Sequence, residues 1–310
     1  MEIRLTQFSL AVRRHARVIT ARITFAAALV AVGFAGVAPL RAAGPAHSIV
    51  LPSVLVAEAP ATLAVLDAAG RLVPDAEVAL SDGHVVKTDA SGRARWVVPA
   101  TPGEFQARIQ GGSIVATAPI VARATPPEIQ LTDFPSVIDA RDQFAISGAR
   151  FQGDADENHV WLGSSAVLVL AASPAALVLL PAPDTPLGPA ELRVEGNGSP
   201  PQPVSVTVVE LEAINPVGPL RIGQQAILTV RARGTTQPLD VELGNWSPLI
   251  IKMLWPANSA SSGSAASSYA DIERVRTSGG EKNEAQIAIV PLSQGKFYVH
   301  ARLARPRPQN

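Results

Sequence analysis

The chain has 310 residues, a length that suits two or three domains rather than one small sandwich. Its 26 basic and 26 acidic residues balance, and hydrophobic residues make up 47% of it, which argues against a disordered chain. Cysteine is absent, which excludes disulfides, thiol nucleophiles, Cys-ligated zinc and a lipoprotein anchor. Aromatic residues are only 5% of the chain, so we expect cores built mostly from Val, Leu, Ile and Ala. The 27 prolines and 23 glycines are spread along the sequence and predict frequent turns between short strands.

Residues 1–46 predict a signal peptide rather than part of the fold. Five arginines form a basic region at the start: Arg4, Arg13, Arg14, Arg17 and Arg22. An uncharged run follows from Phe25 to Leu40, and Gly44-Pro45-Ala46 supplies the small residues that signal peptidase requires before a cut at His47. An uncleaved anchor is the alternative, but the run is weakly hydrophobic and contains Pro39, which favours cleavage. The pair Arg13-Arg14 leaves twin-arginine export open beside the Sec route.

Export would place the mature chain in the periplasm or outside the cell. Residues 1–46 hold six of the 26 basic residues and one of the 26 acidic residues, so their removal leaves 20 basic residues, 25 acidic residues and a net charge of −5. A net negative charge argues against nucleic acid or an anionic membrane as partner. We expect no stable membrane insertion after signal cleavage.

The first mature segment, 47–124, predicts an immunoglobulin-like domain. Seven apolar runs of strand length alternate with turn sequences, and none shows a sustained helical period. The runs are Ile49–Val56, Ala61–Leu66, Glu77–Leu80, His84–Lys87, Ala94–Val98, Phe105–Ile109 and Ile114–Ala118. Antiparallel strands of this length and spacing are typical of a β-sandwich.

A short motif gives this first segment a family resemblance. Thr88-Asp89-Ala90-Ser91-Gly92-Arg93-Ala94 leads to Pro102-Gly103-Glu104-Phe105. This order resembles bacterial Ig-like and carboxypeptidase-regulatory-like modules, in which a Thr-Asp-x-x-Gly turn joins two strands and a Gly-x-aromatic sequence opens the next. The resemblance implies the fold and a module without catalytic activity.

The middle segment, 125–209, follows a stiff linker that Arg123-Ala124-Thr125-Pro126-Pro127 predicts. Seven strands are expected in it: Glu128–Thr132, Gln143–Ser147, His159–Leu162, Ala166–Ala171, Ala176–Leu180, Ala190–Glu195 and Val204–Val209.

Several motifs occur in this middle segment in a fixed order. They are Pro127-Glu128-Ile129, Ile146-Ser147-Gly148-Ala149-Arg150-Phe151, Val160-Trp161-Leu162-Gly163, Leu177–Pro181 and Gly188–Val194. The order resembles the IPT/TIG immunoglobulin-like family, with its Pro-x-Ile opening, Ile-x-Gly-x-x-Phe strand end and Val-x-Leu-Gly hairpin. The resemblance covers about 80 residues and implies a sandwich in which Phe151 points inward.

The third segment, 210–310, predicts another immunoglobulin-like domain. Its candidate strands are Gln225–Arg231, Leu239–Leu243, Ile250–Leu254, Ile272–Thr277, Ala285–Val290 and Phe297–Leu303. A Ser/Ala-rich loop at 257–269 has side chains too small to form a core, and 305–310 is a short Pro/Arg tail. Three such domains in series predict an all-β protein with the shape of a rod.

The chain offers little catalytic chemistry. Four histidines of the mature chain lie far apart, without the spacing of a metal site: His47, His84, His159 and His300. Asp154, Asp156 and Asn158 alternate like the start of a calcium loop, but His159 and Ser165 stand where glycine and glutamate are required. We therefore interpret them as a polar loop and predict no catalytic, cofactor-binding or metal site, and no enzyme.

Two functions remain open. The first is a non-catalytic interaction or structural protein that binds a protein or glycan in the cell envelope. The second is a polysaccharide-binding accessory module of a secreted enzyme or transport complex. Sugar binding usually needs exposed aromatic side chains, and Trp246 and Trp255 are better surface candidates than Trp96 and Trp161, which fall within strands. The supply of aromatic residues is small, which favours the first function.

Overall fold

The computed structural model describes residues 45–122, 130–195, 203–214, 216, 219–245, 247–254 and 272–304. Within these ranges the chain forms twenty-two β-strands and one short 3-10 helix, so the prediction of an all-β protein is confirmed. No helix in the described part of the chain is long and apolar enough to cross a membrane. The predicted linker at 123–127 and the Ser/Ala-rich loop at 257–269 lie outside the described residues.

The first sandwich contains eight strands in two sheets. They are β1 (Ala46–Val50), β2 (Leu55–Val56), β3 (Pro60–Asp67), β4 (Glu77–Leu80), β5 (Val85–Lys87), β6 (Arg93–Val97), β7 (Gly103–Ile109) and β8 (Val115–Val121). One sheet has the order β1-β3-β6 and the other the order β2-β8-β7-β4-β5. Between them lies a core of small aliphatic side chains with Trp96 stacked on Phe105 at 5.7 Å between ring centroids. The predicted Thr-Asp-x-x-Gly turn joins β5 to β6, and the buried Thr88 hydroxyl donates to the Val73 carbonyl.

The second sandwich begins with β9 (Gln130–Asp133) and ends in the first half of β16. Its strands are β10 (Val137–Asp139), β11 (Phe144–Ala149), β12 (His159–Leu162), β13 (Ser165–Ser173), β14 (Ala176–Leu180), β15 (Gly188–Glu195) and β16 (Val204–Ile214). The 3-10 helix η1 (Ala155–Glu157) precedes β12. β13 pairs with β12 at its start and with β14 further on, so it belongs to both sheets.

The third sandwich uses the second half of β16. The other strands are β17 (Ala226–Arg233), β18 (Asp240–Asn245), β19 (Ile251–Leu254), β20 (Ile272–Arg276), β21 (Glu284–Pro291) and β22 (Val299–Leu303). One sheet runs β16-β17-β21-β19 and the other β20-β18-β22. Apolar side chains from both sheets, including the fully buried Phe297 and Leu228, form its core.

Phe151 points inward, as the family resemblance implied. Its side chain is buried in the core of the second sandwich beside Ile146 and Leu177. Arg150, at a φ of 61°, turns the chain after β11 and directs Phe151 back over the strand. A Cβ on Gly148 would lie 2.0 Å from the Gln130 carbonyl oxygen and 2.7 Å from the Phe151 ring, so only glycine fits beneath this ring.

The structure corrects three details of the strand prediction. The expected strand Ile49–Val56 is two strands separated at Pro52, which has no N–H to donate to a neighbour. The strand β10 was not predicted, because three residues are too few to show a period. The prediction of antiparallel strands in the first segment is wrong for β2, which pairs with β8 in parallel, and the unpredicted β10 also pairs in parallel, with β16. Each of these short strands is not joined to its partner by a hairpin, which would force antiparallel pairing, so it can pair in parallel.

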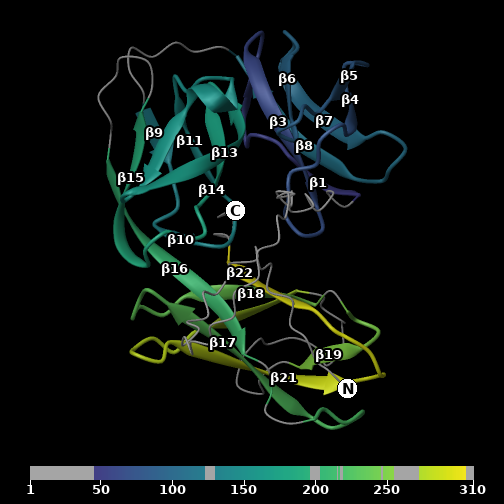
Figure 1. Cartoon of the computed structure of the whole chain (residues 1–310), viewed down its shortest axis with the longest axis vertical. Helices are drawn as coiled ribbons and strands as arrows, with labels where there is room; N and C mark the ends of the chain where they lie inside the picture. The colour runs from purple at the N-terminus through teal and green to yellow at the C-terminus, as the bar shows by residue number, and fades with distance from the viewer. Residues whose placement is uncertain are drawn as a thin grey trace, which may run out of the picture.

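The three sandwiches do not form a rod. Figure 1 shows the first two side by side at the top and the third below them, reached through β16. A single pair of residues, Thr62 of β3 and Ala172 of β13, joins a sheet of the first sandwich to a sheet of the second. The rod prediction was wrong because it rested on the linker alone and took no account of the side-chain contacts described below.

Replacing Phe151 by Ala should cost about 3–5 kcal/mol of unfolding free energy, the usual range for a buried Phe. Denaturant unfolding of residues 47–310 measures this, with Leu168→Ala as the control because Leu168 is 42% exposed on the same sandwich. A loss below about 1 kcal/mol for Phe151→Ala would contradict its place in the core. A shorter fragment for this test has to extend to Ile214, since one that ends at Glu210 cuts through β16.

Candidate functional site

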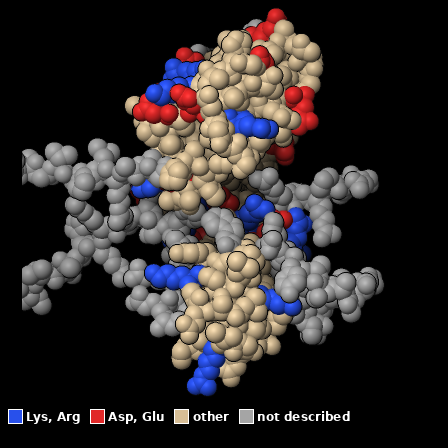
Figure 2. Space-filling view, turned by 90° about the vertical axis from the view of Figure 1, so that its right-hand side faces the viewer, with Lys and Arg blue, Asp and Glu red and all other residues tan. Residues whose placement is uncertain are grey.

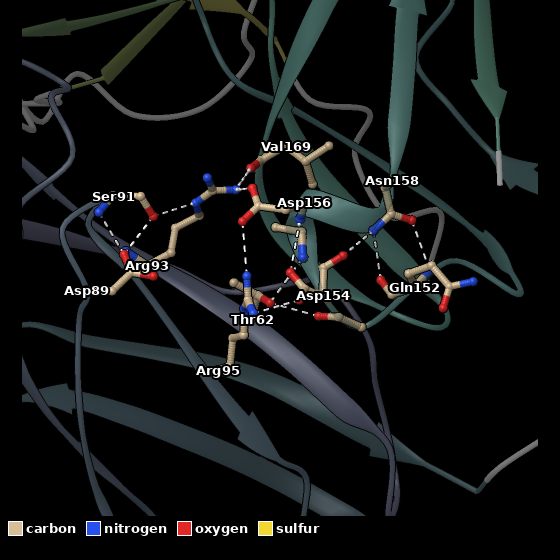
Figure 3. Close-up of polar contacts among 12 residues, drawn as sticks. Thr62, Asp89, Ser91, Arg93, Arg95, Gln152, Asp154, Asp156, Asn158 and Val169 are labelled. Atoms are coloured by element: carbon tan, nitrogen blue, oxygen red, sulfur yellow. Dashed lines mark hydrogen bonds and ion pairs between the residues drawn. The ribbon is translucent and has the colours of Figure 1, made fainter. Parts of the chain in front are cut away.

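Hydrogen bonds and ion pairs join the first and second sandwiches (Figure 3). We call this region the intersandwich contact. The first sandwich contributes β3 and β6, and the second contributes β13 and the loop 151–158 with η1. The two sides come from parts of the sequence that lie 61 to 119 positions apart.

Two arginines on β6 face two aspartates at η1. Arg93 Nη1 lies 2.8 Å from Asp156 Oδ1, and Arg95 reaches Asp154 at 2.8 Å and Asp156 at 3.0 Å. The Arg93 side chain is only 12% exposed, whereas that of Arg95 is 55% exposed. Ion pairs in water contribute little, so the pair made by the shielded Arg93 guanidinium should contribute more to stability than the Arg95 pairs, although its partner Asp156 is 57% exposed.

Arg93 is held in position by further hydrogen bonds. Its Nη1 donates to the Val169 carbonyl at 3.2 Å, and its Nε donates to Ser91 Oγ at 3.1 Å. Ser91 in turn donates to Asp89 Oδ1 at 2.6 Å. This hydroxyl is the main reason that the pKa of Asp89 lies below its ordinary value. The guanidinium therefore has acceptors from both sandwiches.

The backbones of the two sandwiches approach closely at Gly153. Thr62 Oγ1 donates to the Gly153 carbonyl at 2.8 Å and accepts from Ala155 N at 3.3 Å. A Cβ on Gly153 would lie 1.9 Å from the Pro60 carbonyl oxygen, so any other residue would push the sandwiches apart.

The Asp-x-Asp-x-Asn sequence is used within the protein. Asp154 caps η1 by accepting from Asp156 N, and both aspartates bind the two arginines. The Asn158 amide donates to the carbonyls of Gln152 and Asp154, and its oxygen accepts from Gln152 N. The polar loop that we predicted thus fixes its own shape and then docks onto the first sandwich. Among the described residues there is no group of three or more potential metal ligands.

An apolar cluster lies beside these polar contacts. It consists of Val50, Ala64 and Leu66 of the first sandwich and Leu170, Ala171 and Val178 of the second. A further hydrogen bond joins the two sandwiches, since Ser173 Oγ of β13 donates to the Val54 carbonyl at 2.5 Å. Linked domains normally move relative to one another unless their interface is well packed. The combination of buried apolar, hydrogen-bonded and ionic contacts indicates that these two sandwiches form one rigid unit.

The second and third sandwiches share the strand β16. Its residues 204–208 pair with β15, and its residues 210–214 pair with β17. Glu210, at the point of change, forms ion pairs with Arg141 of the second sandwich and Arg233 of the third. A continuous strand cannot bend freely at this point without loss of its pairing on both sides.

A buried carboxyl lies at this junction. Burial raises the pKa of Asp139 on β10 to about 7, helped by the nearby charges of Asp142 and Glu210. The Arg141 N–H, which donates to Asp139 Oδ1 at 3.0 Å, and the Arg141 charge act in the opposite direction. His300 on β22 lies in the same region, and burial lowers its pKa.

The residues considered for metal or sugar binding are dispersed. His84 pairs with Asp82 at 3.1 Å and His159 is exposed on β12, in different sandwiches. Trp96 is buried and Trp161 is half-buried, as expected for strand residues. Trp246 and Trp255 lie outside the described residues. Sequence reasoning missed the arginine partners of Asp154 and Asp156, because nothing in the sequence indicates which residues meet across two domains.

Comparison with known proteins identifies no family for the chain. No family model matches the chain. No curated protein matches it either. Solved structures that match include SGBP-B of the Bacteroides ovatus mixed-linkage glucan utilization locus, in complex with a mixed-linkage heptasaccharide, at 10% identity and a TM-score of 0.30 over 83% of this chain and 74% of that one. Domains 1–6 of the surface layer protein SbsC match at 13% identity and a TM-score of 0.21, over 85% of this chain and 39% of that one. The I9–I11 tandem of titin matches at 8% identity and a TM-score of 0.22, over 82% of this chain and 96% of that one. Scores this low carry no argument about fold or function.

The two arginines should differ in what they contribute to stability. Arg93→Met should cost about 1–3 kcal/mol, because Asp156, Ser91 and the Val169 carbonyl lose a charged donor that is largely shielded from solvent. Arg95→Met should cost less than about 1 kcal/mol, because the pair it breaks is exposed. Denaturant unfolding of the two variants decides this, and an equal or larger loss for Arg95→Met would contradict the assigned roles.

Calcium should leave the protein unchanged. Millimolar calcium is expected not to shift the unfolding temperature, because the two aspartates are already neutralised by arginines. A clear rise that disappears in Asp156→Ala would contradict this account of the loop.

Asp139 should make stability depend on pH. Its pKa of about 7 in the folded protein lies above its ordinary value of 3.8. Between pH 3.8 and pH 7 the folded state therefore holds a proton on this carboxyl that the unfolded state has lost. As the pH rises through this range, the contribution of Asp139 to the free energy of unfolding should therefore fall by roughly 2–4 kcal/mol. Asp139→Asn, which can still accept from Arg141 N, should flatten the profile and stabilise the protein above neutral pH. An unchanged profile in thermal unfolding across pH would contradict the burial of this carboxyl.

Proposed function

We propose that the chain is an exported, non-catalytic scaffold of the cell envelope that binds a protein or glycan through its immunoglobulin-like sandwiches. On this proposal residues 1–46 are a signal peptide, and the second sandwich is of the IPT/TIG kind. The intersandwich contact is the observation that carries the proposal. A protein that only needs to link two partners can use mobile domains, whereas a fixed geometry suits one that holds its partners at a set distance.

The distribution of reactive groups supports a role without catalysis. The described carboxylates with clear partners serve structure: Asp154 and Asp156 pair across the intersandwich contact, and Glu242 is held by Arg274 and Arg302 within the third sandwich. The buried Asp139 lies at the junction of two sandwiches, where its raised pKa affects stability.

Polysaccharide binding beside a secreted enzyme or transport complex is the second candidate. It requires flat aromatic surfaces open to solvent. Among the described tryptophan, tyrosine and phenylalanine side chains, Tyr298 is the exposed one, at 37%. The small number of exposed aromatic side chains favours a protein partner over a glycan.

The proposal can be tested in two arms. Mass spectrometry of the protein from the periplasm or medium should find an N-terminus at or near His47, and an intact segment 1–46 would contradict export with cleavage. In the second arm, a photoreactive group at Val97, which is 66% exposed, should cross-link one envelope protein in living cells. The cross-link should weaken in Arg93→Met, which loosens the scaffold, and persist in Arg95→Met. Binding to a polysaccharide that Tyr298→Ala abolishes would favour the second candidate instead.

A further inference from the structure

The end of the third sandwich that lies farthest from the second has an unusual surface. β16 enters the third sandwich at Glu210 and ends at Ile214, which pairs with Thr229. The turn that precedes β17 and the turn that follows β21 therefore lie at the end of the third sandwich that is remote from the second. We call the segments 219–225, 247–250 and 291–298 the distal tip.

Backbone hydrogen bonds hold the three segments of the distal tip together. Leu292 N donates to the Ile250 carbonyl at 2.7 Å, and Gly223 N donates to the Pro291 carbonyl at 2.9 Å. Ser293 Oγ donates to the Leu249 carbonyl at 2.9 Å. The tip thus has a defined shape before any partner arrives.

Apolar side chains project from each of these segments. Leu249 is 84% exposed, Ile222 is 56% exposed, Leu292 is 43% exposed and Tyr298 is 37% exposed. A single exposed aliphatic side chain is ordinary, but several on adjoining turns mark a contact surface. Phe297, next to Tyr298, is fully buried, so the core of the sandwich is already complete without them.

The charged residues of the distal tip are all basic. Arg221 and Lys296 are exposed, and the three segments contain no aspartate or glutamate. Figure 2 is viewed from the side toward which β21 runs in Figure 1. Among the described residues visible in its lower part, the charged side chains are basic and lie around an uncharged surface.

We propose that the distal tip docks onto the surface of a phospholipid bilayer that contains anionic lipids. The aliphatic side chains would enter the boundary between headgroups and acyl chains, while Arg221 and Lys296 would meet lipid phosphates. A second copy of the chain fits less well, because a two-fold contact through the tip would bring like charges together. A glycan would need aromatic rather than aliphatic side chains, and a protein would need a matching pocket for each projecting side chain.

The net negative charge of the mature chain does not prevent this docking. Strand β17 has eight residues and runs from Ala226 near the tip to Arg233 at the junction. Eight residues of β-strand span about 26 Å, against a screening length of about 8 Å at physiological salt. The acidic residues of the second sandwich, which joins the third at Glu210, are therefore screened from a membrane at the distal tip. The inference goes beyond the proposed scaffold function and can be tested without it.

Vesicle binding of the exported, processed protein tests the proposal. The protein should bind vesicles of phosphatidylglycerol mixed with phosphatidylcholine more tightly than vesicles of phosphatidylcholine alone. Lys296→Gln should weaken this binding about fivefold, since each basic residue near such a surface has an effect of this order. Leu249→Ser should weaken it without loss of stability, because that side chain is 84% exposed.

Two variants serve as matched controls. Lys282→Gln makes the same charge change in the turn before β21, at the opposite end of the same sandwich, and Val97→Ser removes a side chain that is 66% exposed on the first sandwich. Both should bind like the parent protein. Equal weakening by the controls, equal binding to both kinds of vesicle, or binding to soluble alginate in place of vesicles would overturn the proposal. None of these outcomes bears on the intersandwich contact, so the scaffold function would stand or fall separately.

Discussion

The close approach of Gly153 to Pro60 is the constraint on which the arrangement of the first two sandwiches depends. A side chain at position 153 would collide with the Pro60 carbonyl, and without this approach Thr62 could not hydrogen-bond with the loop. The loop also places Asp156 against Arg93, whose half-buried guanidinium has acceptors in both sandwiches. An aliphatic cluster beside it excludes water. The chain therefore achieves without disulfides a rigidity that many exported proteins obtain from covalent bonds.

The second and third sandwiches are joined in a different way. Their connection is the strand β16 itself, which changes partner from β15 to β17 at Glu210. Glu210 is held by one arginine from each sandwich, and the buried Asp139 lies close by with a pKa near neutrality. The first contact is therefore made mainly by side chains, whereas the junction contains a buried carboxyl, Asp139, whose pKa is raised to about 7. The direction of β16 also determines where the distal tip lies relative to the first two sandwiches.

Much of the fold could be predicted from the sequence, because it depends on local signals. Apolar runs and turn residues located most strands to within two residues. The inward position of Phe151 was implied by the family resemblance, and the burial of its side chain confirms that position. Contacts between domains could not be predicted. Arg95 and Asp156 are 61 positions apart, and each is an ordinary surface residue in its own sandwich. The passage of β16 beyond Val209 was missed for the same reason, since a boundary between domains was expected where the pattern of one sandwich ended.

The central claim is that the first two sandwiches move as one body. The absence of cysteine allows spin labels to be attached at chosen positions, and Val85→Cys with Glu191→Cys places one label on an exposed residue of each sandwich. Double electron–electron resonance between the labels measures the distribution of their separation. A single narrow distribution is expected for the parent protein, with clear broadening when Arg93→Met is added. A broad distribution in the parent protein would contradict the claim, because it would mean that the intersandwich contact does not hold the two sandwiches together in solution.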